Sequence, residues 1–160
     1  MGTLPKNGSV SVETTASPAQ VWALVSDVTR AGEWSHETQG GEWMDGAGSA
    51  VPGARFRGRN RQGRTKWSRV CEVLEADAPN RISWRTVPSR IYNDSTRWTY
   101  ELEPTEAGCR VTQRFEVLSI GPMMDRLFYA IIPAHRDRTE ALQADLVRLG
   151  EVAAVTATTT

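Results

Sequence analysis

The sequence has few of the features that mark a secreted or membrane protein. Its 160 residues include only two cysteines, Cys71 and Cys109, which lie far apart and form no Cys-x-x-Cys motif. Such a pair is typical of two buried thiols rather than of a disulfide framework. No apolar run approaches the roughly 20 residues that a membrane helix needs, and the first residues lack the charged and apolar regions of a signal peptide. We therefore expect a cytoplasmic protein.

The chain also lacks an excess of charge of either sign. Nineteen basic and nineteen acidic residues cancel, so no overall field attracts the protein to nucleic acid, and no DNA partner is expected. Positive charge does gather in residues 55–69, which contain no acid and carry Arg55, Arg57, Arg59, Arg61, Arg64, Lys66 and Arg69. A solvated strand face is the favoured interpretation of this basic hairpin, and a surface for RNA or an anionic membrane is the alternative.

Motifs for covalent catalysis, metal binding and nucleotide binding are missing. The only histidines, His36 and His135, stand in no recognisable nucleophile triad, and together with the cysteines they lack the short paired spacings of zinc sites. Gly48 and Gly53 have the separation of a P-loop, but the required Lys and Ser or Thr do not follow. We expect no metal and no other cofactor, and the sequence assigns no catalytic residue.

The composition, with 39% hydrophobic and 24% charged residues, is that of an ordinary globular protein. A chain of this length can bury enough surface for one domain. We expect a flexible N-terminus over residues 1–8, a single domain over 9–152 and a disordered tail over 153–160.

Periodicity and turn signals predict mixed α and β structure. Alternation predicts a strand over 9–16, and Ser17, Pro18 and Gln20 form a capping signal for a helix over 18–28, followed by a short helical turn over 30–34. Further strands are expected at 39–44, 54–61, 64–75, 81–87, 95–103 and 109–119. The loops between them are too short for crossover helices, so the sheet should be antiparallel. An apolar stripe predicts one long helix over 122–152, bent at Pro133.

Three segments resemble a known superfamily when they are taken in order. They are VETTASPAQVWALVSDVTRAGEW near the start, APNRISW in the middle and YELEPTEAGCRVTQRF before the last helix. In this pattern the chain resembles the START/polyketide-cyclase-like (SRPBCC) superfamily, in its polyketide cyclase/dehydrase-type branch. The resemblance implies an α+β helix-grip fold, in which a curved seven-stranded antiparallel sheet wraps around the C-terminal helix, with the first strand beside the last. It also implies a cavity between sheet and helix.

Strand alternation indicates which side chains would line such a cavity. Trp98 and Tyr100 share one face of their strand, and Gln113 and Phe115 share one face of theirs. Gln113 is an inward polar residue, and a buried amide needs partners that an apolar core does not provide. The predicted ligand-binding set is Trp43, Phe56, Trp67, Trp84, Trp98, Tyr100, Gln113, Phe115, Phe128, Ile131, His135 and Arg138. For any single ring, simple filling of the core is an equal alternative. His135 and Arg138 could instead be a satisfied core histidine and an arginine that reaches the helix edge.

Three functions fit these observations. The first is the binding or carriage of a hydrophobic small molecule, a lipid or a polyketide-like compound, in the internal cavity. The second is a cyclase or dehydrase activity on a polyketide-like substrate, which would need few polar groups and no metal or nucleotide. The third is an interaction of the basic hairpin with RNA or an anionic surface. We further expect the glycine-rich segment at the cavity mouth to form a mobile lid, with Gly40, Gly41, Gly46, Gly48 and Gly53.

Overall fold

A computed structural model of the chain describes residues 2–156. The elements are β1 (Asn7–Thr14), α1 (Pro18–Val25), the 3-10 helix η1 (Val28–Glu33), β2 (Thr38–Trp43), β3 (Arg55–Gln62), β4 (Thr65–Asp77), β5 (Arg81–Thr86), β6 (Ser95–Pro104), β7 (Cys109–Ser119), α2 (Pro122–Ile131), the 3-10 helix η2 (Pro133–His135) and α3 (Thr139–Thr156). This order confirms the α+β class expected from the sequence.

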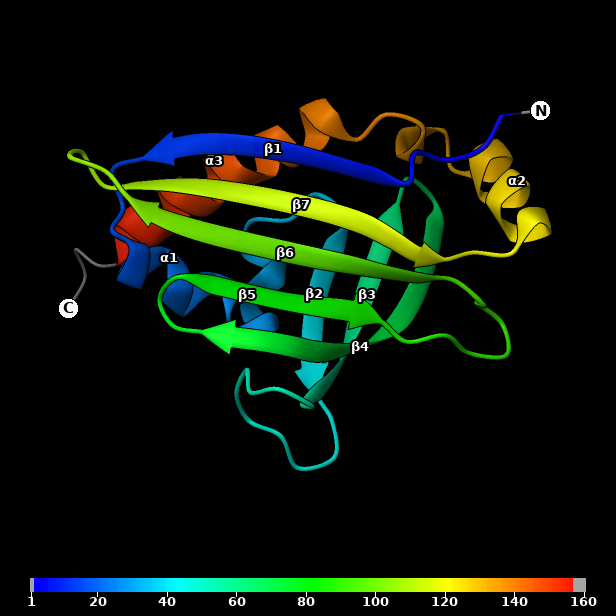
Figure 1. The fold of residues 1–160 in the computed structure, drawn as a ribbon, viewed down its shortest axis with the longest axis horizontal. Coiled ribbons are helices and arrows are strands. Elements are labelled where there is room, and N and C mark those ends of the chain that lie inside the picture. The colour runs from blue at the N-terminus through cyan, green and yellow to red at the C-terminus, as the bar shows by residue number, and fades with distance from the viewer. Residues whose placement is uncertain (1, 157–160) are drawn as a thin grey trace.

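The strands form one antiparallel sheet in the order β1-β7-β6-β5-β4-β3-β2. β1 pairs with β7 from Asn7 opposite Glu116 to Thr14 opposite Cys109, so the first strand lies beside the last, as expected. Figure 1 shows that the sheet is strongly curved and that α1 and α3 lie on its concave side. The helix-grip architecture is therefore confirmed.

The first helix begins where its capping signal predicts. The Gln20 amide donates to the Ser17 hydroxyl at 3.2 Å, and the Ser17 amide donates to the Gln20 side chain at 2.8 Å. The two bonds satisfy amides that have no partner within the first turn of a helix. The helix ends at Val25 rather than at the expected Val28, and Asp27 then caps η1 by accepting from the amide of Thr29.

The prediction of a single long helix over 122–152 is wrong. α2 ends at Ile131, Ile132 has non-helical angles (φ −124°, ψ 77°), and α3 begins only at Thr139. The physical reason is Pro133, which lacks an amide donor and drives the preceding residue out of the α region. The predicted apolar stripe is accordingly divided between the two helices. Its α3 portion is buried at Leu142, Leu146 and Leu149, whereas Leu127 and Ile131 of α2 are half exposed.

The main hydrophobic core lies between α1, α3 and the strands β1, β5, β6 and β7. It includes Val21 and Leu24 of α1, Leu146 of α3 and Val111 of β7, each almost completely buried. α3 approaches β1 so closely that a Cβ at Gly150 would lie 2.5 Å from the Thr14 hydroxyl oxygen. Gly150 is therefore needed for this contact, which fixes one end of the helix against the sheet.

Both ends of the domain differ from the expected boundaries. β1 begins at Asn7, and the segment before it is held by α2, because the Leu4 amide donates to the Asp125 carboxylate at 2.8 Å. The Lys6 side chain donates to the same carboxylate, which is buried and needs these partners. At the other end α3 continues to Thr156, and the remaining part of the expected tail, 157–160, lies outside the described residues.

Candidate functional site

A cavity of about 290 Å³ lies between the concave face of the sheet and the segment from α2 to the start of α3. Its walls come from almost every strand, from the residues between η1 and β2, and from α2, η2 and α3. The lining residues that are also exposed, among them Pro5, Lys66 and Ile131, mark the mouth. The mouth is therefore formed by the N-terminal segment, the β3–β4 turn and α2.

The residues expected to line the cavity do so, except for Trp43. The lining includes Phe56, Trp67, Trp84, Trp98, Tyr100, Gln113, Phe115, Phe128, Ile131, His135 and Arg138. Trp43 is not part of the wall, and its ring packs edge-on against Phe56 at 5.7 Å between centroids. It belongs to a separate small core with Val28, Cys71 and Val73.

The glycine-rich loop does not form a lid. Gly41 lines the cavity as part of β2, but no residue from 44 to 54 does. Figure 1 shows this loop projecting from the sheet between β2 and β3, away from α2. Gly46 and Gly53 have φ values of +78° and +89°, so their role is to allow the turns of this loop.

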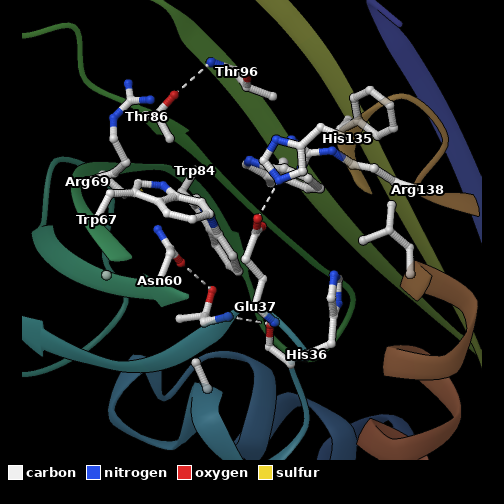
Figure 2. Close-up of a pocket in the computed structure, with 18 of the residues that line it drawn as sticks. His36, Glu37, Asn60, Trp67, Arg69, Trp84, Thr86, Thr96, His135 and Arg138 are labelled. Carbon is white, nitrogen blue, oxygen red and sulfur yellow. Dashed lines mark hydrogen bonds and ion pairs between the residues drawn. The ribbon is translucent and has the colours of Figure 1, made fainter. Parts of the chain in front are cut away.

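Glu37 and His135 form a polar pair inside the cavity. His135 is 8% exposed, and its Nε2 is hydrogen-bonded to the Glu37 carboxylate, toward which it points in Figure 2. Burial opposes ionisation of Glu37, but the hydrogen bond with His135 and the charge of Arg138 outweigh it and lower the pKa of Glu37. An ionised carboxylate can only accept hydrogen bonds, so Nε2 carries the proton and donates it to Glu37.

Arg138 lies beside this pair, just before α3. Its guanidinium carbon is 5.5 Å from the centroid of the Trp98 ring and 6.0 Å from that of Phe115. Burial lowers the pKa of the guanidinium, and the nearby charges of Glu37 and Asp94 oppose this effect. An arginine remains charged under these conditions, so the cavity contains a cation stacked on two aromatic rings.

A second arginine, Arg69 of β4, faces the same cavity but is paired with Asp94. Its Nη1 lies 3.0 Å from each carboxylate oxygen of Asp94, and its Nη2 donates to the backbone oxygen of Asp94 at 3.0 Å. The guanidinium also stacks on Tyr92 at 5.0 Å. The charge pattern of residues 55–69 assigns Arg69 to the outer basic face, and this assignment is wrong: Arg69 is 9% exposed.

At the inner end of the cavity Gln113 and Tyr100 form a buried polar pair. The Gln113 Nε2 donates to the Tyr100 hydroxyl at 2.7 Å. Burial raises the pKa of Tyr100 above its ordinary range, so the hydroxyl stays protonated. Among the described residues Gln113 Oε1 has no hydrogen-bond partner, and neither has the indole N–H of Trp34, another wall residue. Buried polar atoms normally have partners, so these two are open to a bound molecule.

Sequence reasoning missed Glu37, His36 and Asp94. Glu37 and His36 precede β2 in an irregular segment where no periodicity assigns a direction to a side chain. Arg69 could have been identified, because it shares a strand face with Trp67 and Cys71, both of which line the cavity. Arg69 was instead grouped with the other basic residues of 55–69, and its position on the inward face of the strand was overlooked.

Within residues 2–156 no three His, Cys, Asp or Glu side chains gather in a way that would hold a metal ion. In the same range no helix is both long enough and apolar enough to cross a membrane.

Known proteins show the same architecture and the same sequence pattern. The model of the family described as polyketide cyclase / dehydrase and lipid transport matches residues 7–151. The chain belongs to this family. No curated protein matches the sequence.

Solved structures of other proteins show the same fold. A Polyketide_cyc-like protein from Corynebacterium glutamicum, Cgl2372, is 28% identical, with a TM-score of 0.59 and coverage of 94% of this chain and 92% of that one. TTHA0849 from Thermus thermophilus shares the fold at 19% identity, with a TM-score of 0.71 and coverage of 94% and 98%. MLL2253 from Mesorhizobium loti shares it at 14% identity, with a TM-score of 0.66 and coverage of 94% and 98%.

Proposed function

We propose that this protein binds a hydrophobic small molecule in the cavity between the sheet and the C-terminal helices. The observation that carries the proposal is the wall itself, in which Trp67, Trp84, Trp98, Phe115 and Phe128 surround about 290 Å³ of space. Aromatic side chains combine a large apolar surface with flat faces, and they stack well on planar or unsaturated molecules. Membership of a family described by lipid transport as well as cyclisation supports the same function.

The size of the cavity limits the ligand. Pockets for small molecules commonly measure roughly 300–1,000 Å³. At about 290 Å³, this cavity is just below the lower limit of that range. We expect a ligand of two or three fused rings, or an apolar chain of similar volume, rather than a two-chain lipid.

A neutral fluorescent ligand tests the proposal. N-phenyl-1-naphthylamine has two connected apolar ring systems and becomes bright in an apolar site. We expect saturable binding of one molecule per chain. Val117→Arg, which places a charge in the wall, should weaken it by at least about tenfold. Leu118→Arg is the matched control, because Leu118 is the next residue, is 42% exposed and is not part of the wall.

Two results would contradict the proposal. One is the absence of saturable binding by the wild-type protein. The other is equal affinity of wild type, Val117→Arg and Leu118→Arg while all three stay folded by circular dichroism, because the dye would then bind elsewhere on the surface.

A second candidate function, catalysis of the cyclase or dehydrase type, is favoured by the Glu37–His135 pair. A carboxylate that orients a histidine inside an apolar cavity is suited to moving a proton to or from a bound carbonyl compound. Intramolecular addition of an enolate carbon to a ketone, followed by loss of water, would need this one acid–base group and a chain held in a bent form.

The test of the second candidate uses a synthetic polyketone thioester. Catalysis predicts a product lighter than the substrate by one water, formed by wild type and lost in His135→Phe. Arg136→Gln serves as the control, because Arg136 is the next residue along the chain, is exposed and does not line the cavity. Product formation at the uncatalysed rate with every variant would exclude this activity for that substrate class.

A further inference from the structure

The cavity contains a cation, Arg138, that has acids nearby but no direct hydrogen bond or ion pair with any described residue. Within residues 2–156 the Arg138 side chain makes no hydrogen bond and no salt bridge, and its contacts are the faces of Trp98 and Phe115. A guanidinium offers five N–H donors in a planar fork that matches a carboxylate. Charged groups enclosed by protein are normally paired, so this arrangement has a cost that a binding partner would offset.

The acids near Arg138 are each bonded to another group. Glu37 accepts from His135, Asp94 is held by two hydrogen bonds from Arg69, and Asp145 is bonded to His36. Of the two arginines in the wall, Arg69 is therefore paired with an acid, and Arg138 is not. Figure 2 shows Arg138 beside His135, across the cavity from Trp67 and Arg69.

We propose that Arg138 binds the carboxylate of an amphipathic ligand whose planar apolar body lies against the aromatic wall. This inference rests on the proposed binding function and adds the chemical class of the ligand, an aromatic or similarly flat monocarboxylate. The guanidinium lies over the Trp98 ring and makes no other polar contact, so its N–H groups can make two parallel hydrogen bonds to the two carboxylate oxygens. The apolar body then occupies the space bounded by Trp98, Phe115 and Trp84.

Competition between two molecules of the same shape tests this assignment. Bound N-phenyl-1-naphthylamine reports on occupancy of the cavity, and 2-naphthoate and 2-naphthamide are added as competitors at neutral pH. The two differ in charge but hardly in size. In the wild-type protein naphthoate should displace the dye at a concentration at least about tenfold lower than naphthamide, because hydrogen bonds between ions are stronger than those to a neutral amide.

Variants of Arg138 separate charge from packing. In Arg138→Met the preference for naphthoate should disappear, so that naphthoate and naphthamide compete equally. The affinity for the neutral dye should stay within about threefold of wild type. Arg138→Lys keeps the charge without the fork, and it should retain part of the preference. Arg136→Gln is the matched control for loss of one positive charge. Arg136 lies two residues away, is exposed, and stacks on Tyr129 outside the cavity wall.

Two outcomes overturn the inference while leaving the binding function intact. Either naphthoate and naphthamide compete equally in the wild-type protein, or the preference persists unchanged in Arg138→Met. If Arg138→Met no longer binds the dye, Arg138→Lys decides: a naphthoate preference supports the inference, and equal competition overturns it. Failure of the wild-type protein to bind the dye at all would contradict the proposed function itself.

Discussion

His36 and Asp145 join the segment before β2 to the middle of α3. The His36 amide donates to Asp145 Oδ1 at 2.9 Å, and the His36 Nδ1 lies 2.7 Å from Asp145 Oδ2. Asp145 is 2% exposed, whereas the His36 side chain is 28% exposed. Because Glu37 follows directly, this pair also positions the carboxylate that holds His135.

The pair predicts a definite pH dependence of stability. The hydrogen bond to Asp145 raises the pKa of His36 above its ordinary value of 6.5. Protonated His36 therefore stabilises the folded state. Its contribution is complete below pH 6.5 and disappears as the pH rises through the higher folded-state pKa. We expect the difference in free energy of unfolding between wild type and His36→Gln to be larger at about pH 5.5 than at about pH 8.5.

Urea unfolding of wild type and His36→Gln across this pH range measures that difference. Groups that titrate in the same way in both proteins do not contribute to it. A difference that stays constant or grows toward high pH would show that His36 is not stabilised in its protonated form.

The Arg69–Asp94 pair predicts a large loss of stability when one partner is removed. Both side chains are about nine-tenths buried, so Arg69→Met leaves the carboxylate enclosed without its partner and should cost about 3–5 kcal/mol. The control is Arg97→Met, which removes an arginine from an exposed pair with Glu116 at 3.8 Å and should cost less than about 1 kcal/mol. Equal costs in denaturant unfolding would mean that the buried pair contributes no more than a surface one.

The unpartnered oxygen of Gln113 predicts a preference for ligands that carry a hydroxyl group. 2-Naphthol can donate to Gln113 Oε1, whereas naphthalene cannot, so wild type should bind naphthol more tightly in competition with the dye. Gln113→Leu should abolish this preference and lower the free energy of unfolding by about 1–3 kcal/mol, because it leaves the buried Tyr100 hydroxyl without its partner. A preference that survives in Gln113→Leu would place the hydroxyl elsewhere.

Both thiols should be unreactive in the folded protein. Cys71 and Cys109 are free and buried, and burial raises the pKa of the Cys71 thiol to about 12. Because the thiolate is the reactive form, 5,5′-dithiobis(2-nitrobenzoate) at about pH 8 should react with both only at the rate of unfolding. Fast release of one equivalent of chromophore from the native protein would contradict the buried position of one of them.

The fold followed from local signals that act over short distances. The Ser17–Gln20 cap, the alternation of Trp98 with Tyr100 and the short turns all have physical causes within a few residues, and each was predicted. The break after Ile131 was underestimated. The apolar residues on both sides of Pro133 have helical spacing, which predicted one continuous helix. Spacing alone does not show that the apolar residues of α2 are half exposed and do not continue the buried stripe of α3.

The site was only partly predictable. Residues on regular strands, such as Trp84 and Gln113, have a direction that alternation fixes, and they line the cavity. Glu37 depends on tertiary structure, because its direction is set by His135 and by its neighbour's bond to Asp145, both distant in sequence. Trp43 was predicted to line the cavity because it is a large ring on a strand, but it packs in the separate small core instead.

The central claim is that an apolar ligand enters the space between sheet and helices, and the tryptophans allow a direct test. Trp34, Trp67, Trp84 and Trp98 line the cavity, whereas Trp22 and Trp43 do not. In a two-dimensional ¹H–¹⁵N spectrum each indole N–H gives its own signal, so a titration with N-phenyl-1-naphthylamine follows both groups together. We predict saturable shifts of the four cavity indoles and little change at Trp22 and Trp43. Shifts confined to Trp22 and Trp43, or no saturable shift of any indole, would contradict the account.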